Sequence, residues 1–329
     1  MKRLSRLFRV LFSSDPQVRT GRQLAYFFQR IGIPLNRSRP LVKLLKTIFH
    51  PISYARYCYL GVRQTYAHQP SNSEHLRANG FLFFNVADVI PHAEPVLELL
   101  RTLYEERRAG VGEKTTIWEN RRKSSQMEYP TLRNCFQEDD LINHPEIADF
   151  LLDDYFLSLA AVEIGSLPRI SGVMLAWSVK NDLLEASQLF HLDQEDNKQV
   201  KFFINLSEVG DQSGPLTFLS ATDSMRVSSE LGTAAPGEHV GPSHRVPDSV
   251  VDGMLTPNHV NRLIGPAGTG LALNTGRCLH YGSRCQADDR VILMFQFVPA
   301  NVFREPSSFG PLFPKKRYQA CRIRTAVLA

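Results

Sequence analysis

Residues 188–215 contain the side chains of this sequence that are best suited to chemistry. At their centre, His191 and Asp193 are separated by one residue. Alternate side chains of an extended backbone point to the same face, so the imidazole and the carboxylate should converge. Such a pair supplies two of the three ligands of the facial triad that binds ferrous iron and leaves the opposite positions open. The pattern therefore predicts an iron site that needs a second imidazole.

His280 is the candidate for that second imidazole, and an apolar strand follows it. Residues 290–297 are mostly apolar and lie between two aspartates and a proline, as expected of a buried strand. Arg290 opens this strand. A guanidinium at a fixed position can bind a carboxylate through two parallel hydrogen bonds, which suits the distal acid group of 2-oxoglutarate. We therefore expect Arg290 to anchor that cosubstrate.

Strands and helices around these residues must position them. Apolar runs predict strands at 81–84, 170–180, 200–206 and 290–297, and the strand starting at 271–273 is expected to carry His280. One helix is expected to open at Pro91, and a longer one to run from Asn143 to Gly165. A His-x-Asp triplet alone often only satisfies a buried hydrogen bond. The iron interpretation depends on its conjunction with a following strand, a Gly-Pro turn and the later His and Arg.

In these residues the chain resembles the phytanoyl-CoA dioxygenase family of iron(II)- and 2-oxoglutarate-dependent oxygenases, over roughly residues 75–300. The segments that carry the resemblance are 80–84, 149–165, 187–193, 201–209, 213–218 and 278–284. The resemblance implies an α+β protein with a double-stranded β-helix, the jelly-roll or cupin-like core, and flanking helices. The family often continues its Gly-Pro turn into Pro-Gly-Ser-His, and this chain departs from that pattern at 219–224. The departure bears on the substrate more than on the metal.

The family pattern also implies roles for single residues. His191, Asp193 and His280 would be the metal ligands, and Arg290 would hold 2-oxoglutarate. Fe(II), 2-oxoglutarate and O2 would then hydroxylate an aliphatic C–H of a small-molecule or lipid-like substrate, with release of succinate and CO2. Iron halogenases of this group carry a small residue in place of the carboxylate, so Asp193 favours hydroxylation or a related oxidation. As further expectations, Ser283 and Asn205 would hydrogen-bond the cosubstrate, and Gln188 would orient a ligand.

Two functions from other classes use the same residues. One is a membrane-associated binding or scaffold protein whose barrel is catalytically inactive. The other is a zinc hydrolase with the same three ligands. Retention of iron and formation of succinate would separate the oxygenase from the scaffold, and dependence on O2 would separate it from the hydrolase.

Composition fits a soluble globular protein in a reducing compartment. The chain has 329 residues, of which 43% are hydrophobic and 22% are charged, so it can bury a full core. Its five cysteines are an odd number and include no Cys-x-x-Cys pair, which argues against a disulfide framework or a structural zinc site. We expect a cytoplasmic protein, with peripheral membrane association as an open possibility.

Charge and composition divide the chain into three parts. Residues 1–74 predict a basic amphipathic helical extension, residues 75–302 the catalytic domain, and residues 303–329 a C-terminal tail. Residues 64–75 have the composition of a linker. An insertion at about 225–262 is rich in Gly, Pro, Ser and charge. It is interpreted either as a lid over the substrate or as a solvated insertion without a catalytic role.

The basic extension is the main candidate for a contact with another surface. Residues 1–75 contain thirteen Lys or Arg and two acids, a net charge of +11, whereas the whole chain carries +5. Residues 4–12 and 41–49 combine helical apolar spacing with basic residues on the other side. These helices would lie on an anionic membrane within residues 1–50 or pack on the domain, and a mitochondrial transit peptide is less favoured because of Asp15. Nucleic acid is not expected as a partner.

Overall fold

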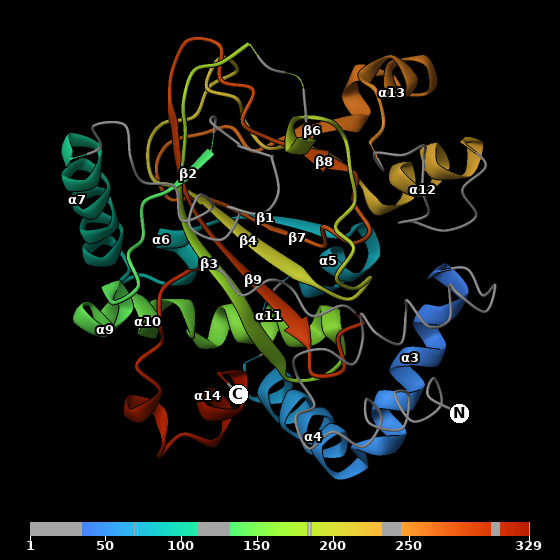
Figure 1. Cartoon of the computed structure of the whole chain (residues 1–329), viewed down its shortest axis with the longest axis vertical. Coiled ribbons are helices and arrows are strands. Elements are labelled where there is room, and N and C mark those ends of the chain that lie inside the picture. The colour runs from blue at the N-terminus through green and yellow to red at the C-terminus, as the bar shows by residue number, and fades with distance from the viewer. Residues whose placement is uncertain are drawn as a thin grey trace, which may run out of the picture.

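Two antiparallel sheets form the centre of the protein in a computed structural model that describes residues 35–68, 70, 72–110, 132–182, 184, 186–231, 245–303 and 310–328 (Figure 1). The larger sheet has the strand order β1-β7-β4-β9-β3-β2, and the smaller has the order β6-β5-β8. The strands are β1 (Phe81–Asn85), β2 (Leu132–Asn134), β3 (Pro168–Ser178), β4 (Val200–Asn205), β5 (Thr217–Leu219), β6 (Val260–Arg262), β7 (Thr269–Leu273), β8 (His280–Tyr281) and β9 (Arg290–Pro299). The strands expected at 81–84, 170–180, 200–206 and 290–297 are confirmed within two residues at most of their ends.

Helices cover the outer face of the large sheet, and α12 and α13 lie near the small one (Figure 1). Helix α11 packs on β3, β4 and β9 and also on α4. The described helices are α3 (Leu35–Phe49), α4 (Pro51–Ala67), α5 (Ser73–Asn79), α6 (Val86–Val89), α7 (Glu94–Gly110), α9 (Asp140–Asn143), α10 (Pro145–Leu151), α11 (Asp154–Ile164), α12 (Ala221–Glu230), α13 (Asp248–Met254) and α14 (Arg322–Val327).

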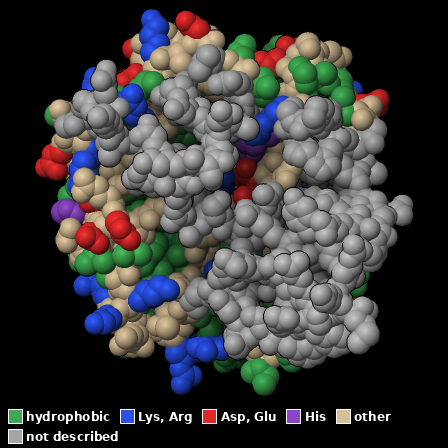
Figure 2. Space-filling view, viewed as in Figure 1, with side chains coloured by type: hydrophobic (Ala, Val, Ile, Leu, Met, Phe, Trp, Pro, Cys, Tyr) green, Lys and Arg blue, Asp and Glu red, His purple; other side chains and the backbone are tan. Residues whose placement is uncertain are grey.

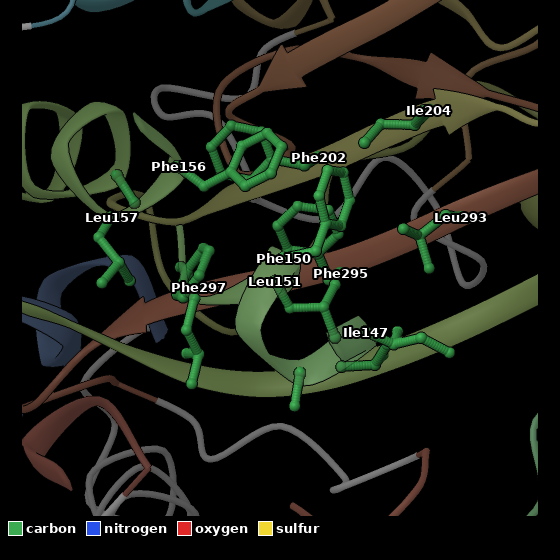
Figure 3. Packing of buried hydrophobic residues seen from close by; sticks show 14 of the residues in the cluster. Ile147, Phe150, Leu151, Phe156, Leu157, Phe202, Ile204, Leu293, Phe295 and Phe297 are labelled. Atoms are coloured by element: carbon green, nitrogen blue, oxygen red, sulfur yellow. The ribbon is translucent and has the colours of Figure 1, made fainter. Parts of the chain in front are cut away.

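The central strands bury both of their faces, and this produces two cores. On β4, Phe202 and Ile204 pack with the helices, whereas Phe203 packs toward the small sheet. Phe156 of α11 joins Phe202 and Phe295 in the helix-side core, which Figure 3 shows from close by. The other core contains residues of both sheets and therefore lies between them. Residues of β4 that share a face with Phe203 thus point into the space between the sheets.

Two expected elements differ from the structure. The helix expected over 143–165 is interrupted, because the side chain of Asp153 accepts a hydrogen bond from the Tyr155 amide at 2.8 Å and caps a new helix, α11. The expected end at Gly165 is confirmed, with φ at 80°. The strand starting at 271–273 does not carry His280. Strand β7 ends at Leu273 in the large sheet, and the chain crosses to the small sheet before His280.

Helix α4 occupies part of the expected linker. It runs to Ala67, and α5 starts at Ser73. Its buried face includes Gly61 and Gln64, so the helical spacing of apolar residues is interrupted in the sequence. Gly61 is required by the close approach of the domain, because a Cβ atom there would lie 2.3 Å from the Leu167 amide nitrogen. The helix expected to open at Pro91 begins instead at Glu94.

The predicted extension and tail both contact the domain where they are described. In α3, Lys43 pairs with Asp196 at 2.8 Å and Lys46 donates to the Val302 carbonyl at 2.6 Å. Residues 41–49 thus pack on the domain with their lysines inward, while residues 4–12 lie outside the described residues. The tail ends in α14, where the Ala326 carbonyl accepts a hydrogen bond from the Tyr57 hydroxyl at 2.7 Å.

All five cysteines lie within the described residues and are free thiols, as expected. None of the described helices has the length and the apolar character needed to cross a membrane.

Candidate metal centre

The two predicted imidazole ligands are direct neighbours across a pair of strand segments. His191 and His280 form an antiparallel bridge in which each backbone amide donates to the carbonyl of the other at 3.0 Å. Their ring centroids are 4.3 Å apart. The backbone pairing therefore fixes both rings on one face of the small sheet.

Backbone carbonyls determine which ring nitrogens can bind a metal. Nδ1 of His191 lies 2.9 Å from the Leu189 carbonyl oxygen, and Nδ1 of His280 lies 3.0 Å from that of Cys278. A carbonyl can only accept, so Nδ1 carries the proton in each ring and Nε2 keeps its lone pair. Burial lowers the pKa of both histidines, which keeps the rings neutral as metal ligands must be.

Asp193 completes the predicted triad. Its backbone amide donates to the Thr275 carbonyl at 2.9 Å. Oδ1 lies 3.9 Å from Nε2 of His191, and Oδ2 lies 3.9 Å from Nε2 of His280. The three ligand atoms lie within 4.8 Å of one another, and in the described part of the chain this is the one such group of His, Cys, Asp or Glu. Two imidazoles and one carboxylate suit a divalent iron-type ion.

Lys201 also belongs to this centre, and sequence reasoning did not single it out. Its Nζ lies 2.7 Å from Oδ2 of Asp193. Burial on its own would raise the pKa of Asp193, but Lys201 and the two imidazoles outweigh it and hold that pKa well below its usual range. Burial would likewise lower the pKa of Lys201, but Asp193 and Glu195 raise it. A lysine within the mostly apolar strand β4 was the available signal.

Arg290 is buried and only partly satisfied. Its Nη2 donates to Ser283 Oγ at 3.0 Å and to Ser178 Oγ at 3.3 Å. Within the described structure, its Nε and Nη1 are buried without a hydrogen-bond partner. Gly282 leaves room beside it, since a Cβ atom there would lie 3.2 Å from Nη2. Burial lowers the pKa of Arg290. Two unused donors on a buried cation are the arrangement that a carboxylate would complete.

The other three predicted cosubstrate or ligand contacts lie around Arg290 and the triad. Ser283 has a positive φ of 66°, a conformation that non-glycine residues seldom adopt and that occurs at functional sites. Gln188 donates to the Ser283 carbonyl at 2.9 Å and to the Asn181 side chain at 2.6 Å, so it supports the Ser283 turn. Asn205 donates to the Gly265 carbonyl at 3.3 Å, and its Oδ1 is buried without a partner in the described residues.

Residues 232–244 of the insertion at 225–262 lie outside the described residues, and its other parts contact the segments that carry the histidines. The Val246 amide donates to the Phe190 carbonyl at 2.8 Å. Arg284 pairs with Asp248 of α13 through two hydrogen bonds of 2.5 and 2.9 Å, and its guanidinium lies 3.5 Å over the Tyr281 ring. Arg284 thus meets a protein carboxylate. Near β8, Figure 2 shows a recess in which histidine and acidic side chains are visible.

Comparisons with known proteins find similar solved structures but show no family. No family model matches the chain, and a search of the curated proteins finds no match. It is similar to HygX of Streptomyces hygroscopicus with nickel and 2-oxoglutarate bound, at 15% identity and a TM-score of 0.44 over 69% of this chain and 85% of that chain.

Two further solved structures resemble the chain to a similar degree. The non-heme alpha ketoglutarate dependent carbocyclase SnoK from nogalamycin biosynthesis is 14% identical, with a TM-score of 0.47 over 73% of this chain and 92% of that chain. EctD from S. alaskensis is 14% identical, with a TM-score of 0.42 over 73% and 87%. At these values the similarity identifies no family, and function has to be inferred from the side chains of the site.

Proposed function

We propose that this protein is an Fe(II)- and 2-oxoglutarate-dependent dioxygenase of the phytanoyl-CoA dioxygenase type, which hydroxylates an aliphatic C–H of a small-molecule or lipid-like substrate. One observation carries the proposal. Two imidazoles with free Nε2 atoms and one carboxylate converge, and the same space between the sheets contains a buried guanidinium with two unused donors. The two sheets would be the two halves of a double-stranded β-helix.

Each residue has a defined task in this proposal. The Nε2 atoms of His191 and His280 and one oxygen of Asp193 would hold iron, and the backbone carbonyls on Nδ1 would keep both rings in place. Iron, when bound, would supply the oxidative chemistry that couples decarboxylation of 2-oxoglutarate to oxidation of the substrate. Nε and Nη1 of Arg290 would bind the far carboxylate of 2-oxoglutarate, with Ser178 and Ser283 orienting the guanidinium.

The insertion at 225–262 would act as the lid. A hydrophobic cluster joins it to the histidine strands and contains Phe190, Leu192, Leu219, Val227, Val246, Val251, Leu255 and Leu279. The described parts of the insertion, residues 225–231 and 245–262, are packed in this way and held by the Arg284–Asp248 pair, and they can exclude water from the reaction. The alternative of a loosely solvated insertion does not explain that packing.

The unused donors of Arg290 also separate the oxygenase from the two other functions. A scaffold with an inactive barrel has no need of a buried, half-satisfied guanidinium, which is costly to maintain. A zinc hydrolase would use the triad but would not need a buried carboxylate anchor behind it. The scaffold and the zinc hydrolase are therefore treated as alternative outcomes of the test below.

The test is a calorimetric titration of Fe(II)-loaded protein with 2-oxoglutarate under anaerobic conditions. We expect Arg290→Ala to weaken 2-oxoglutarate binding by about 10- to 100-fold, the value of a lost charge-assisted pair. Arg317→Ala is the matched control, because Arg317 pairs with Asp149 at the surface. Equal affinity in wild type and Arg290→Ala would remove the anchor, and failure of wild type to form succinate in O2 with any tested substrate would favour the scaffold.

We further propose that the extension contacts an anionic lipid surface. Helix α4 exposes Ile52, Tyr59, Val62 and Tyr66 at helical spacing, and the sequence has no acid from residue 16 to residue 73. Apolar and aromatic side chains together with arginine are typical of interfacial helices. Ile52→Ser/Tyr59→Ser should reduce co-sedimentation with vesicles containing phosphatidylserine, whereas Leu312→Ser should not. Equal binding of wild type to vesicles with and without phosphatidylserine would contradict the contact.

A further inference from the structure

A lysine shares the carboxylate that the triad offers to a metal. Lys201 lies on β4 of the large sheet, two residues before Phe203 and on the same face. Its side chain therefore extends into the space between the sheets, where Nζ reaches Oδ2 of Asp193 at 2.7 Å. Both side chains are 15% exposed, so water screens the pair only weakly.

Oδ2 is also an atom of the candidate metal site. It lies 3.9 Å from Nε2 of His280, while Oδ1 of the same carboxylate lies 3.9 Å from Nε2 of His191. A divalent ion held by these three residues would be a second cation on one carboxylate, a few ångströms from the ammonium. Two like charges at that separation in a poorly hydrated site repel each other strongly.

We propose that Lys201 is a tethered competitor of the metal ion: its ammonium shares Asp193 with the divalent cation and thereby weakens the binding of that cation. The ammonium also occupies Oδ2, which leaves Oδ1 to the ion and makes Asp193 a ligand through one oxygen. The protein would then fill with iron only where free Fe(II) is plentiful. This inference rests on the proposed metal centre, but not on the oxygenase reaction.

The test is calorimetric titration with Ni(II), in buffer that contains no 2-oxoglutarate. We expect Lys201→Met, which keeps the length of the side chain and removes its charge, to bind Ni(II) about tenfold tighter or more. Lys201→Arg keeps the charge and should stay within about threefold of wild type. Lys198→Met removes an exposed lysine from the segment just before β4 and should have no effect.

Three results would overturn the inference or its basis. Lys201→Met binding Ni(II) no tighter than wild type would make Lys201 a structural support of Asp193. Lys201→Arg tightening as much as Lys201→Met would show that charge is not the cause. If wild type binds Ni(II) and His280→Ala binds it equally well, the ion is elsewhere and the metal centre itself fails.

Loss of folding in Lys201→Met would not prevent the test. Lys201→Gln is also neutral and keeps a polar side chain at this position, and it should likewise tighten Ni(II) binding. In wild type, the ¹⁵Nζ resonance of Lys201 should shift when Zn(II), a diamagnetic ion, is added. A resonance that stays unchanged while Zn(II) binds would contradict competition.

Discussion

The two faces of β4 and β9 differ in what they bury. On the helix side, Phe202 and Phe295 stack with their centroids 5.0 Å apart, and Phe156 packs against both. On the side of the small sheet, the same two strands carry Arg290, which is buried, and Lys201, whose side chain is 15% exposed. Successive residues of one strand therefore serve the helix-side core and the polar face.

This difference separates stability from function within single strands. Apolar contacts on the helix side stabilise the fold without any ligand. The polar face contains cations and an unsatisfied guanidinium, which destabilise a fold unless a partner is bound. Groups that are so costly are expected where a ligand needs them. Substitutions on the two faces should therefore have separable effects.

The largest separation is expected for His280→Ala. Loss of one of three ligands should abolish Ni(II) binding in calorimetry and succinate formation in O2. Thermal unfolding should change little, since the bridge to His191 is made by backbone groups. His144→Ala is the control, because His144 pairs with Glu146 outside the triad and the insertion. Retained Ni(II) binding in His280→Ala would contradict the assignment of metal binding to this face.

Phe202→Ala should lower the stability of the fold and leave metal binding unchanged. Removing a fully buried phenyl ring from the helix-side core should lower the free energy of unfolding by about 3–5 kcal/mol, measured by urea denaturation. The folded variant should bind Ni(II) with wild-type affinity, since the ring faces away from the triad. A changed Ni(II) affinity would show that the two faces are coupled.

Acidification should destabilise the polar face. The pKa of His191 and of His280 is lowered in the folded protein, whereas an unfolded histidine has a pKa of about 6.5. As pH falls through about 6.5, the unfolded state takes up protons that the folded state does not, so the free energy of unfolding falls. Above that pH this dependence disappears. His280→Gln should lose less stability than wild type between pH 7.5 and 5; an equal loss would contradict this assignment.

Ser178→Ala should have the smallest effect. It removes one hydrogen bond of 3.3 Å from Arg290 and leaves the bond to Ser283. The expected loss in 2-oxoglutarate affinity is about 2- to 10-fold, consistent with one hydrogen bond of about 1 kcal/mol. Calorimetry on the Fe(II)-loaded protein measures it. A loss as large as that of Arg290→Ala would mean that Ser178 binds the cosubstrate itself.

The sequence predicted those parts of the site that depend on local spacing. His191 and Asp193 converge as strand periodicity requires, and Arg290 opens a buried strand. Lys201 was not singled out, because its partner Asp193 lies across the space between the sheets. Local sequence spacing does not predict such a pairing. The switch of sheet between β7 and β8 was missed for the same reason.

The extension shows a second limit of periodicity. The spacing in residues 41–49 predicted a helix with apolar residues and lysines on opposite sides, and the helix is present. However, Lys43 and Lys46 face the domain, because Asp196 and the Val302 carbonyl lie there. Hydropathy alone cannot identify such partners, since they are set by tertiary contacts.

The most direct test of the metal centre and its anchor is a crystal structure with Ni(II) and 2-oxoglutarate bound. We expect the ion at about 2.1 Å from Nε2 of His191 and of His280 and bonded to Asp193. The far carboxylate of 2-oxoglutarate should accept hydrogen bonds from Nε and Nη1 of Arg290. An ion outside the triad, or a 2-oxoglutarate molecule that leaves both of these N–H groups without a partner, would contradict the account.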